Sequence, residues 1–257
     1  MKIKMKPITR RQFFKTVAGS VVSFAALLAS APRAFAEKFF HEPPWLTKSP
    51  YWGMAIAVDN CIGCGKCVEA CKTENDVPRQ PYFFRTWVER YMIHRSGETK
   101  VESPNGGMDG FPPIKKSGDM MRSFFVPKMC NHCENSPCEQ VCPVGASFRT
   151  QDGVVLIDRK YCIGCRYCIQ ACPYGCRYFH PKLHVADKCT LCYHRITRGL
   201  KPACVEACPN GARIFGDLSN PESPVSKFIE NNTVQVLKPA MGTRPKLVYR
   251  GLDREVR

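Results

Sequence analysis

Beyond its first 36 residues, this chain of 257 residues has no apolar run near the roughly 20 residues that a membrane-spanning helix needs. We therefore expect it to reach a membrane only through a partner. The sequence also lacks a glycine-rich nucleotide-binding loop and a metal-ligand set with an open position, so we expect no active site of its own. Acidic residues are few, 22 against 38 lysines and arginines, which gives a net charge of +16.

Cysteine, by contrast, is abundant: 16 of the 17 cysteines fall into four groups of four, and only Cys176 is left over. The groups are Cys61, Cys64, Cys67 and Cys71; Cys130, Cys133, Cys138 and Cys142; Cys162, Cys165, Cys168 and Cys172; and Cys189, Cys192, Cys204 and Cys208. Proline follows the last cysteine of every group except the first, which has Lys72 there.

The third group has the spacing C-x₂-C-x₂-C-x₃-C-P, which is typical of bacterial ferredoxins. In that pattern three thiolates bind one [4Fe–4S] cluster and the fourth cysteine binds a different cluster. A disulfide framework has no reason to repeat one tight spacing, and a structural zinc needs two cysteine pairs well apart. The sequence therefore predicts four [4Fe–4S] clusters, with zinc sites or disulfides as the alternatives.

The separation of the groups predicts which cysteines share a cluster. Groups two and three are 19 residues apart, about what one ferredoxin module needs, so we expect them to exchange their fourth cysteines, and groups one and four to do the same. The predicted sets are the first set, Cys61, Cys64, Cys67 and Cys208; the second set, Cys71, Cys189, Cys192 and Cys204; the third set, Cys130, Cys133, Cys138 and Cys172; and the fourth set, Cys142, Cys162, Cys165 and Cys168.

This pairing predicts an α+β fold of two interleaved bacterial-ferredoxin-like modules with long loops and an extended C-terminal tail. The first module covers residues 37–125 and 178–257, and the second, residues 126–177, is inserted into it. Strands are expected before the cysteine loops, at 52–58, 123–128 and 154–161, and after Cys208 at 212–216, while a short helix carries the last cysteine of each group. Residues 94–119 are polar and rich in Gly and Pro, which indicates a long loop that could hold a small hairpin.

Residues 1–36 resemble an export signal of the twin-arginine kind. Arg10 and Arg11 stand before Phe13 and Lys15, an apolar run of about 15 residues follows, and Ala34–Ala36 form a small-x-small cleavage site. We expect cleavage after Ala36 and a location on the exported, periplasmic side of the membrane; an uncleaved anchor is the alternative. Because this route exports folded protein, clusters could be loaded before the thiols meet an oxidising compartment.

The positive charge does not predict a nucleic-acid partner. Seven basic residues and no acid lie in residues 1–36, so the rest of the chain carries +9. Four oxidised clusters with their thiolates contribute about −2 each, which offsets most of this excess.

The cysteine pattern and several flanking segments resemble the four-cluster iron–sulfur subunits of bacterial respiratory complexes. These include tetrathionate, polysulfide and cytochrome-nitrite reductase systems and the membrane complex of dissimilatory sulfite reduction. The resemblance covers about residues 51–250 and rests on P-K-M-C-N-H-C, R-K-Y-C-I-G-C-R-Y-C-I-Q-A-C-P-Y, A-D-K-C-T-L-C, P-A-C-V-E-A-C-P, G-D-L-S-N-P-E-S and V-L-K-P-A-M-G-T-R-P-K.

The resemblance implies a non-catalytic subunit that passes electrons between a quinone-reactive, multi-pass membrane subunit and a catalytic subunit with molybdopterin or several haems. The alternative is a sulfite-reduction-linked or hydrogenase-linked membrane complex without a molybdopterin partner. Some relatives have tryptophan in place of one cysteine of the third group and hold a [3Fe–4S] cluster; Cys165 is present here, so four cubic clusters are expected. The resemblance also implies that the first set lies toward the catalytic partner and the fourth toward the quinone.

A few residues beside the cluster loops are not needed as ligands. Cys176 is expected to be a buried free thiol. His132 and His194 stand next to cluster cysteines and are expected to pack or to donate N–H···S hydrogen bonds. Arg166 and Lys72 could raise a local potential by their charge or could lie in solvent.

Overall fold

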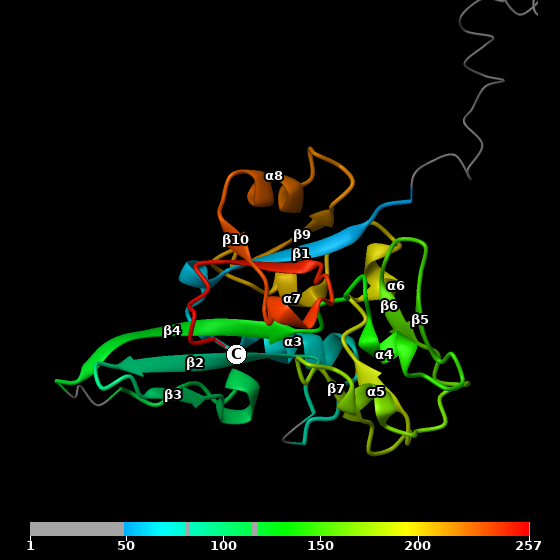
Figure 1. Ribbon diagram of the computed structural model, residues 1–257, viewed down its shortest axis with the longest axis horizontal. Helices are drawn as coiled ribbons and strands as arrows, with labels where there is room; N and C mark the ends of the chain where they lie inside the picture. Colours follow the sequence, from blue (N-terminus) through cyan, green and yellow to red (C-terminus); the bar gives the residue numbers. More distant parts are fainter. Residues whose placement is uncertain (1–48, 81–82, 115–117, 257) are drawn as a thin grey trace, which may run out of the picture. The chain divides into compact units, whose positions relative to one another are not determined.

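The computed structural model describes residues 49–80, 83–114 and 118–256, so the expected export signal lies outside the described residues. The described chain mixes short helices with four small β-sheets, which confirms the α+β class (Figure 1). Residues from Ser49 onward belong to one structural unit, and the boundaries of the two modules within it stay a prediction. No helix among the described residues has the length and apolarity needed to cross a membrane.

The largest sheet joins the two ends of the described chain. Its strand order is β10 (Val234–Gln235), β11 (Leu247–Arg250), β1 (Trp52–Ala57) and β9 (Arg213–Asp217). Strand β1 runs parallel to β11 and antiparallel to β9, and its residues from Gly53 onward are buried. A central strand covered on both faces reads as a continuous apolar run, as G-M-A-I-A does here. The strands expected near residues 52–58 and 212–216 are thus confirmed.

The C-terminal region is more ordered than the extended tail that the sequence predicts. Helix α8 (Pro224–Glu230) follows Ser223, whose side chain accepts a hydrogen bond from the Ser226 amide, and begins with proline at its first position. Strand β11 then pairs with β1 because Leu247 and Tyr249 alternate with less buried neighbours and fill the core beneath the sheet. A short 3₁₀ helix, η3 (Pro239–Met241), lies between β10 and β11.

A second sheet has the order β3 (Thr99–Glu102), β2 (Thr86–His94) and β4 (Met120–Met129), with the long antiparallel pair β2 and β4 side by side (Figure 1). Strand β4 confirms the strand expected before Cys130, and it begins earlier than predicted. The hairpin of β2 and β3 and the 3₁₀ helix η2 (Pro104–Gly107) occupy part of the region expected to be a long loop. Strand β2 lies outside the predicted strands. Its residues T-W-V-E-R-Y-M-I-H alternate in burial along most of their length, as expected of a strand with one covered face.

Short helices follow the cysteine loops, and each carries the third cysteine of its group. They are α3 (Lys66–Glu74), α4 (Pro137–Gln140), α5 (Tyr167–Gln170) and α7 (Ala203–Glu206). Only α3 continues through the fourth cysteine, so the expectation that each helix carries the last cysteine is wrong for the other three. The physical reason is the proline after the fourth cysteine, which disfavours helical geometry at the preceding residue. Lys72 replaces that proline in the first group, and α3 is correspondingly longer.

Two hairpins and a short helix complete the chain. The hairpins are β5 (Ser147–Arg149) with β6 (Val155–Ile157) and β7 (Arg177–Phe179) with β8 (Ala186–Lys188); α6 (Tyr193–Ile196) follows, and η1 (Val58–Asn60) precedes Cys61. Strand β6 is shorter than the predicted 154–161. Several cluster cysteines belong to the hydrophobic core itself, with Cys67, Cys189 and Cys204 packed among Ile56, Val68 and Val88. The predicted cluster sites are therefore partly enclosed by apolar side chains.

Candidate iron–sulfur centres

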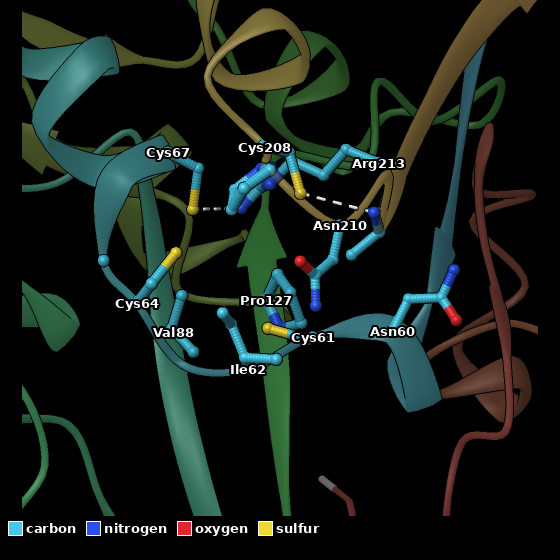
Figure 2. A pocket seen from close by; sticks show the side chains of 13 residues that line it. Asn60, Cys61, Ile62, Cys64, Cys67, Val88, Pro127, Cys208, Asn210 and Arg213 are labelled. Atoms are coloured by element: carbon cyan, nitrogen blue, oxygen red, sulfur yellow. Dashed lines mark hydrogen bonds between the residues drawn. The ribbon is translucent and has the colours of Figure 1, made fainter.

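The first set of cysteines lines one cavity. Figure 2 shows Cys61, Cys64 and Cys67 from the loop and start of α3, with Cys208 opposite them from the segment after α7. The cavity encloses about 330 Å³, part of it open to solvent. The backbone N–H of Ala212 donates to Cys208 Sγ at 3.3 Å, and Arg213 Nη2 donates to Cys67 Sγ at 3.4 Å. Residues about 140 positions apart in the sequence thus meet around one space.

The second set lines another cavity, of about 270 Å³, and all four of its cysteines are buried. Cys71 comes from α3, one helical turn beyond Cys67, and Cys204 comes from α7, which packs against α3. The side-chain amide of Asn75 lies 3.7 Å from Cys71 Sγ and 3.5 Å from Cys192 Sγ, and the Leu191 amide donates to Cys189 Sγ at 3.3 Å. These contacts are N–H···S hydrogen bonds of the kind that tune cluster potentials.

The third set lines a cavity of about 330 Å³. Cys130 and Cys133 follow β4, Cys138 lies on α4 and Cys172 comes from the segment after α5. Arg177 Nη2 donates to Cys138 Sγ at 2.8 Å. His132, with φ of +43°, is fully enclosed in the wall of this cavity.

The fourth set is the most open. Cys165 is exposed, and Cys142 and Cys162 are half-buried. Burial raises the pKa of the Cys168 thiol, and the positive charge of Arg177 opposes this effect. The nearby thiols of Cys162 and Cys142 raise the same pKa further, so the three thiols are neighbours. The Ser147 amide donates to Cys142 Sγ at 3.4 Å.

Burial gives most of the enclosed thiols a high pKa. It is the largest cause for Cys61, Cys138 and Cys204, whose pKa values rise to about 11, and for Cys133 and Cys189, which rise to about 12. Without a bound metal these groups would be neutral at pH 7. A coordinating metal deprotonates a thiol outright, so iron supplies the positive charge that such buried sulfurs need to act as thiolates.

Unpartnered polar atoms also fit an iron–sulfur cluster. His132 Nδ1 accepts the Val155 amide at 3.1 Å, so the ring proton lies on Nε2, which is buried without a partner among the described residues. The side-chain amide of Asn131, in the same cavity, is likewise buried and unpartnered. A cluster held by the third set would bring sulfur acceptors into this cavity. In the described part of the chain, no three His, Cys, Asp or Glu side chains converge as a single-ion site requires.

The remaining residues singled out beside the cluster loops lie in different environments. Cys176 is buried, as predicted, and donates to the Met129 carbonyl at 3.0 Å. His194 lies at the surface with its Nε2 2.7 Å from Glu74 Oε1. Lys72 does not lie in solvent: it is buried, donates to the Pro78 carbonyl at 2.8 Å and stands over the Phe84 ring. Arg166 stacks on the Phe179 ring.

The sequence reasoning missed the two arginines that contact cluster cysteines. Both stand five residues after a cysteine in a repeated segment, C-P-Y-G-C-R-Y-F at 172–179 and C-P-N-G-A-R-I-F at 208–215. An internal repeat of this kind was a signal that could have found Arg177 and Arg213.

Comparisons with known proteins agree with this geometry. Residues 60–146 and residues 121–218 each match a family model described as a 4Fe-4S dicluster domain. The chain is 39% identical to a tetrathionate reductase subunit from Salmonella typhimurium, over 95% of this chain and 89% of that protein. It is 44% identical to the tetrathionate reductase subunit of the same type from Archaeoglobus fulgidus, over 76% and 79% of the two chains.

A third relative is the Hdr-like menaquinol oxidoreductase iron-sulfur subunit 1 of Archaeoglobus fulgidus, which is 33% identical over 96% of this chain and all of that protein. Two dicluster domains and the grouped cysteines give the chain four [4Fe–4S] clusters. The chain therefore belongs to the family of iron–sulfur subunits of respiratory complexes, which transfer electrons and are not themselves catalytic.

Proposed function

We propose that the chain relays electrons through four clusters held by the four predicted cysteine sets. The clusters supply one-electron transfer, and the protein's part is to hold them close together and away from water. The observation that carries the ligand assignment is that the first, second and third sets each line a cavity of their own. Each of these sets combines cysteines from two different groups, as the exchange of fourth cysteines requires.

The contacts between sets support the order first, second, third, fourth. Cys67 and Cys71 lie one turn apart on α3 but belong to the first and second sets. Cys138 and Cys142 stand four residues apart at α4 and join the third and fourth sets in the same way. Between the modules, burial raises the pKa of Cys189 to about 12, and the next largest cause is the nearby Cys130. This supports an arrangement in which the second and third sets are neighbours.

The two ends of this series are also its most accessible points. Of the seventeen cysteines, all within the described residues, Cys64 and Cys165 are the two that are exposed. They belong to the first and the fourth set. Exposed apolar side chains stand close to both in the sequence, with Ile62 two positions before Cys64, and Tyr161, Ile163 and Tyr167 within four positions of Cys165. Partners that exchange electrons with the chain would dock at these two ends.

We infer that the partners are a quinone-reactive membrane subunit at the fourth set and a catalytic molybdopterin or multihaem subunit at the first. The names of the relatives, a tetrathionate reductase subunit and a menaquinol oxidoreductase subunit, support an assembly of this type. Residues 1–36 support twin-arginine export to the periplasmic side. Replacing Arg10 and Arg11 by lysine should then leave the protein in the cytoplasmic fraction, and unchanged export would contradict this location.

Iron analysis tests the relay itself. Purified protein should contain about 16 iron atoms per chain, four for each cubic cluster, with sulfide in equal amount. Low-temperature electron paramagnetic resonance should show reduced [4Fe–4S] signals after dithionite treatment. A colourless, iron-free protein would overturn the proposal.

A matched pair of cysteine variants tests the direction of the series. Cys165→Ser should block reduction of the chain by a quinol analogue in the membrane-bound complex, while dithionite should still reduce the other three clusters. Cys64→Ser should leave quinol-driven reduction of the remaining clusters intact. The opposite result, with Cys64→Ser alone blocking quinol electrons, would reverse the orientation.

The Hdr-like relative favours a second candidate, a quinol-linked complex without a molybdopterin partner, because it aligns over its full length. Purification of the complex in mild detergent separates the two. Molybdenum in stoichiometric amount supports the first candidate, and its absence from an intact, quinol-active complex supports the second.

A further inference from the structure

Five buried cations have no carboxylate within salt-bridge distance in the described part of the chain, and three of them, Arg177, Arg213 and Lys188, contact residues of the cysteine sets. Arg177 is 5% exposed, Arg213 is 3% and Lys188 is 1%. The other two, Lys72 and Lys246, donate to the carbonyls of Pro78 and Gly153, whereas Arg85 is paired with Asp187 at 2.9 Å. A buried charge is strongly destabilising unless an opposite charge and hydrogen bonds compensate it. Cysteine sulfurs that act as thiolates can compensate Arg177 and Arg213, which contact them directly.

Arg213 lies between the first and second sets. Its Nη2 is 3.4 Å from Cys67 Sγ, and the residue lines the cavity of the first set (Figure 2). The same guanidinium donates to Thr86 Oγ1 at 2.7 Å and contacts Met129 Sδ at 3.4 Å. Thr86 and Met129 line the cavity of the second set.

Arg177 has the equivalent place between the third and fourth sets. Its Nη2 donates to Cys138 Sγ at 2.8 Å, and the residue lines the cavity of the third set. Its Nη1 donates to Ser147 Oγ at 2.8 Å, and the Ser147 amide donates to Cys142 Sγ of the fourth set. Ser147 stands five residues after Cys142, where the repeated segment has arginine in its two other copies.

Lys188 joins the two modules. Its Nζ donates to the carbonyl of Cys189, a member of the second set, at 2.8 Å. It also donates to the carbonyl of Val155, which lines the cavity of the third set. Each of the three gaps between consecutive sets thus has one of these three cations beside it.

We propose that Arg213, Lys188 and Arg177 set the reduction potentials of the clusters on either side of them and lower the repulsion between neighbouring reduced clusters. The inference rests on the proposed ligand sets. Each reduction adds one electron to a cluster, taking its charge from about −2 to about −3, and moves no proton. A fixed positive charge stabilises the reduced form more than the oxidised form, so it raises the potential.

The test is a redox titration of the holoprotein with dithionite, followed by electron paramagnetic resonance, on neutral and charge-retaining variants. Arg213→Gln should lower the potentials of the first and second clusters, Lys188→Gln those of the second and third, and Arg177→Gln those of the third and fourth. Each shift should be at least tenfold in the reduction equilibrium, which is 59 mV for one electron. The potential of the second cluster should therefore fall in both the Arg213 and the Lys188 variant, and that of the third cluster in both the Lys188 and the Arg177 variant.

Controls separate charge from packing. Arg213→Lys, Arg177→Lys and Lys188→Arg should keep potentials close to those of the natural protein, and Lys227→Gln, at the exposed pair with Glu222, should change none. Unchanged potentials in neutral variants that hold all their iron would overturn the inference and leave the relay intact. If a neutral variant loses iron, the charge-retaining variant at the same position is the deciding measurement. A full iron content in that variant supports the inference, and iron loss there too overturns it. Natural protein with far fewer than four clusters would instead contradict the proposed function.

Discussion

Gly65 shows how much a single residue can control at the first cluster site. It directly precedes α3 with a φ of +69°, a conformation that side-chain-bearing residues rarely adopt. A Cβ at this position would lie 2.3 Å from the carbonyl oxygen of Gly107, which is a backbone atom and cannot rotate away. The start of the helix that carries Cys67 and Cys71 therefore depends on glycine.

We predict that Gly65→Ala destabilises the protein by more than the roughly 1–2 kcal/mol that a left-handed conformation costs an alanine, because the steric clash adds to it. The first and second clusters should be lost first on heating, measured by visible absorbance and iron release. Gly97→Ala is the matched control, since Gly97 also has a positive φ, +85°, but no atom within 4 Å of the added Cβ. Equal effects of the two changes would contradict the role of the Gly107 contact.

Cys176 gives a second prediction for a single residue. Because sixteen other cysteines form complete sets, Cys176→Ser should retain all the iron and the signals of four clusters. Cys176→Ala should do the same and lower the stability by about 1 kcal/mol, since the hydrogen bond to the Met129 carbonyl is lost. Iron analysis would measure the cluster content of both variants, and guanidinium unfolding would measure the change in stability. Loss of a quarter of the iron would show that Cys176 is a ligand.

For single residues, the sequence predicted the grouping of the cysteines but not the positions of the buried cations between the clusters. Cysteine spacing is diagnostic because a cluster needs thiolates at fixed separations, so the grouping could be read from positions alone. The places of Arg177, Lys188 and Arg213 depend on which distant residues surround them after folding. One prediction for Lys72 was also wrong in part, because the carbonyl and aromatic ring that bury it come from the loop after α3.

At the scale of elements, the pairing of β1 with β11 closes the described chain on itself. Tyr249 of β11 is fully buried opposite Ile56 of β1, and its hydroxyl lies 3.3 Å from the Pro127 carbonyl on β4. One side chain therefore connects the first sheet to the strand that leads to Cys130.

We predict that Tyr249→Ala lowers the free energy of unfolding by about 3–5 kcal/mol, as large aromatic truncations in cores do. Tyr249→Phe should cost about 1 kcal/mol, since it removes only the hydroxyl. Guanidinium unfolding, followed by the loss of cluster absorbance, would measure both. Val248→Ala, at the less buried neighbouring position, is the control; a similar loss there would argue against a special role for Tyr249.

Local sequence patterns predicted some of the helices and strands but not others. Strands next to cysteine groups were predicted because the ferredoxin pattern places them, and β1, β4 and β9 are present. Strand β2 and the ordered tail have no cysteine nearby, and β11 has only four residues whose partner lies almost 200 positions away. Helix lengths could have been predicted from the prolines after Cys142, Cys172 and Cys208, because each disfavours a further turn.

For the whole molecule, the two ends of the cluster series differ in their surroundings. Seven of the twelve large apolar side chains exposed among the described residues lie between residues 141 and 183, the segment that contains the fourth set. Exposed apolar patches of this kind mark surfaces that bind other proteins. In the loop of the first set, from Cys61 to Cys67, Ile62 is the one large apolar side chain that is exposed. This asymmetry agrees with two partners of different kinds.

Ile62 and Ile163 allow a matched test of this polarity, because both occupy the second position of a C-I-G-C segment and both are more than half exposed, at 55% and 66%. Ile163→Asp should weaken binding of the membrane partner at least tenfold, since a charge in an apolar contact must be desolvated. Ile62→Asp should weaken binding of the catalytic partner and leave the membrane partner attached. Co-purification in mild detergent would measure both, with iron content confirming that each variant keeps four clusters. Release of the same partner by both variants would show that the ends are not separate docking sites.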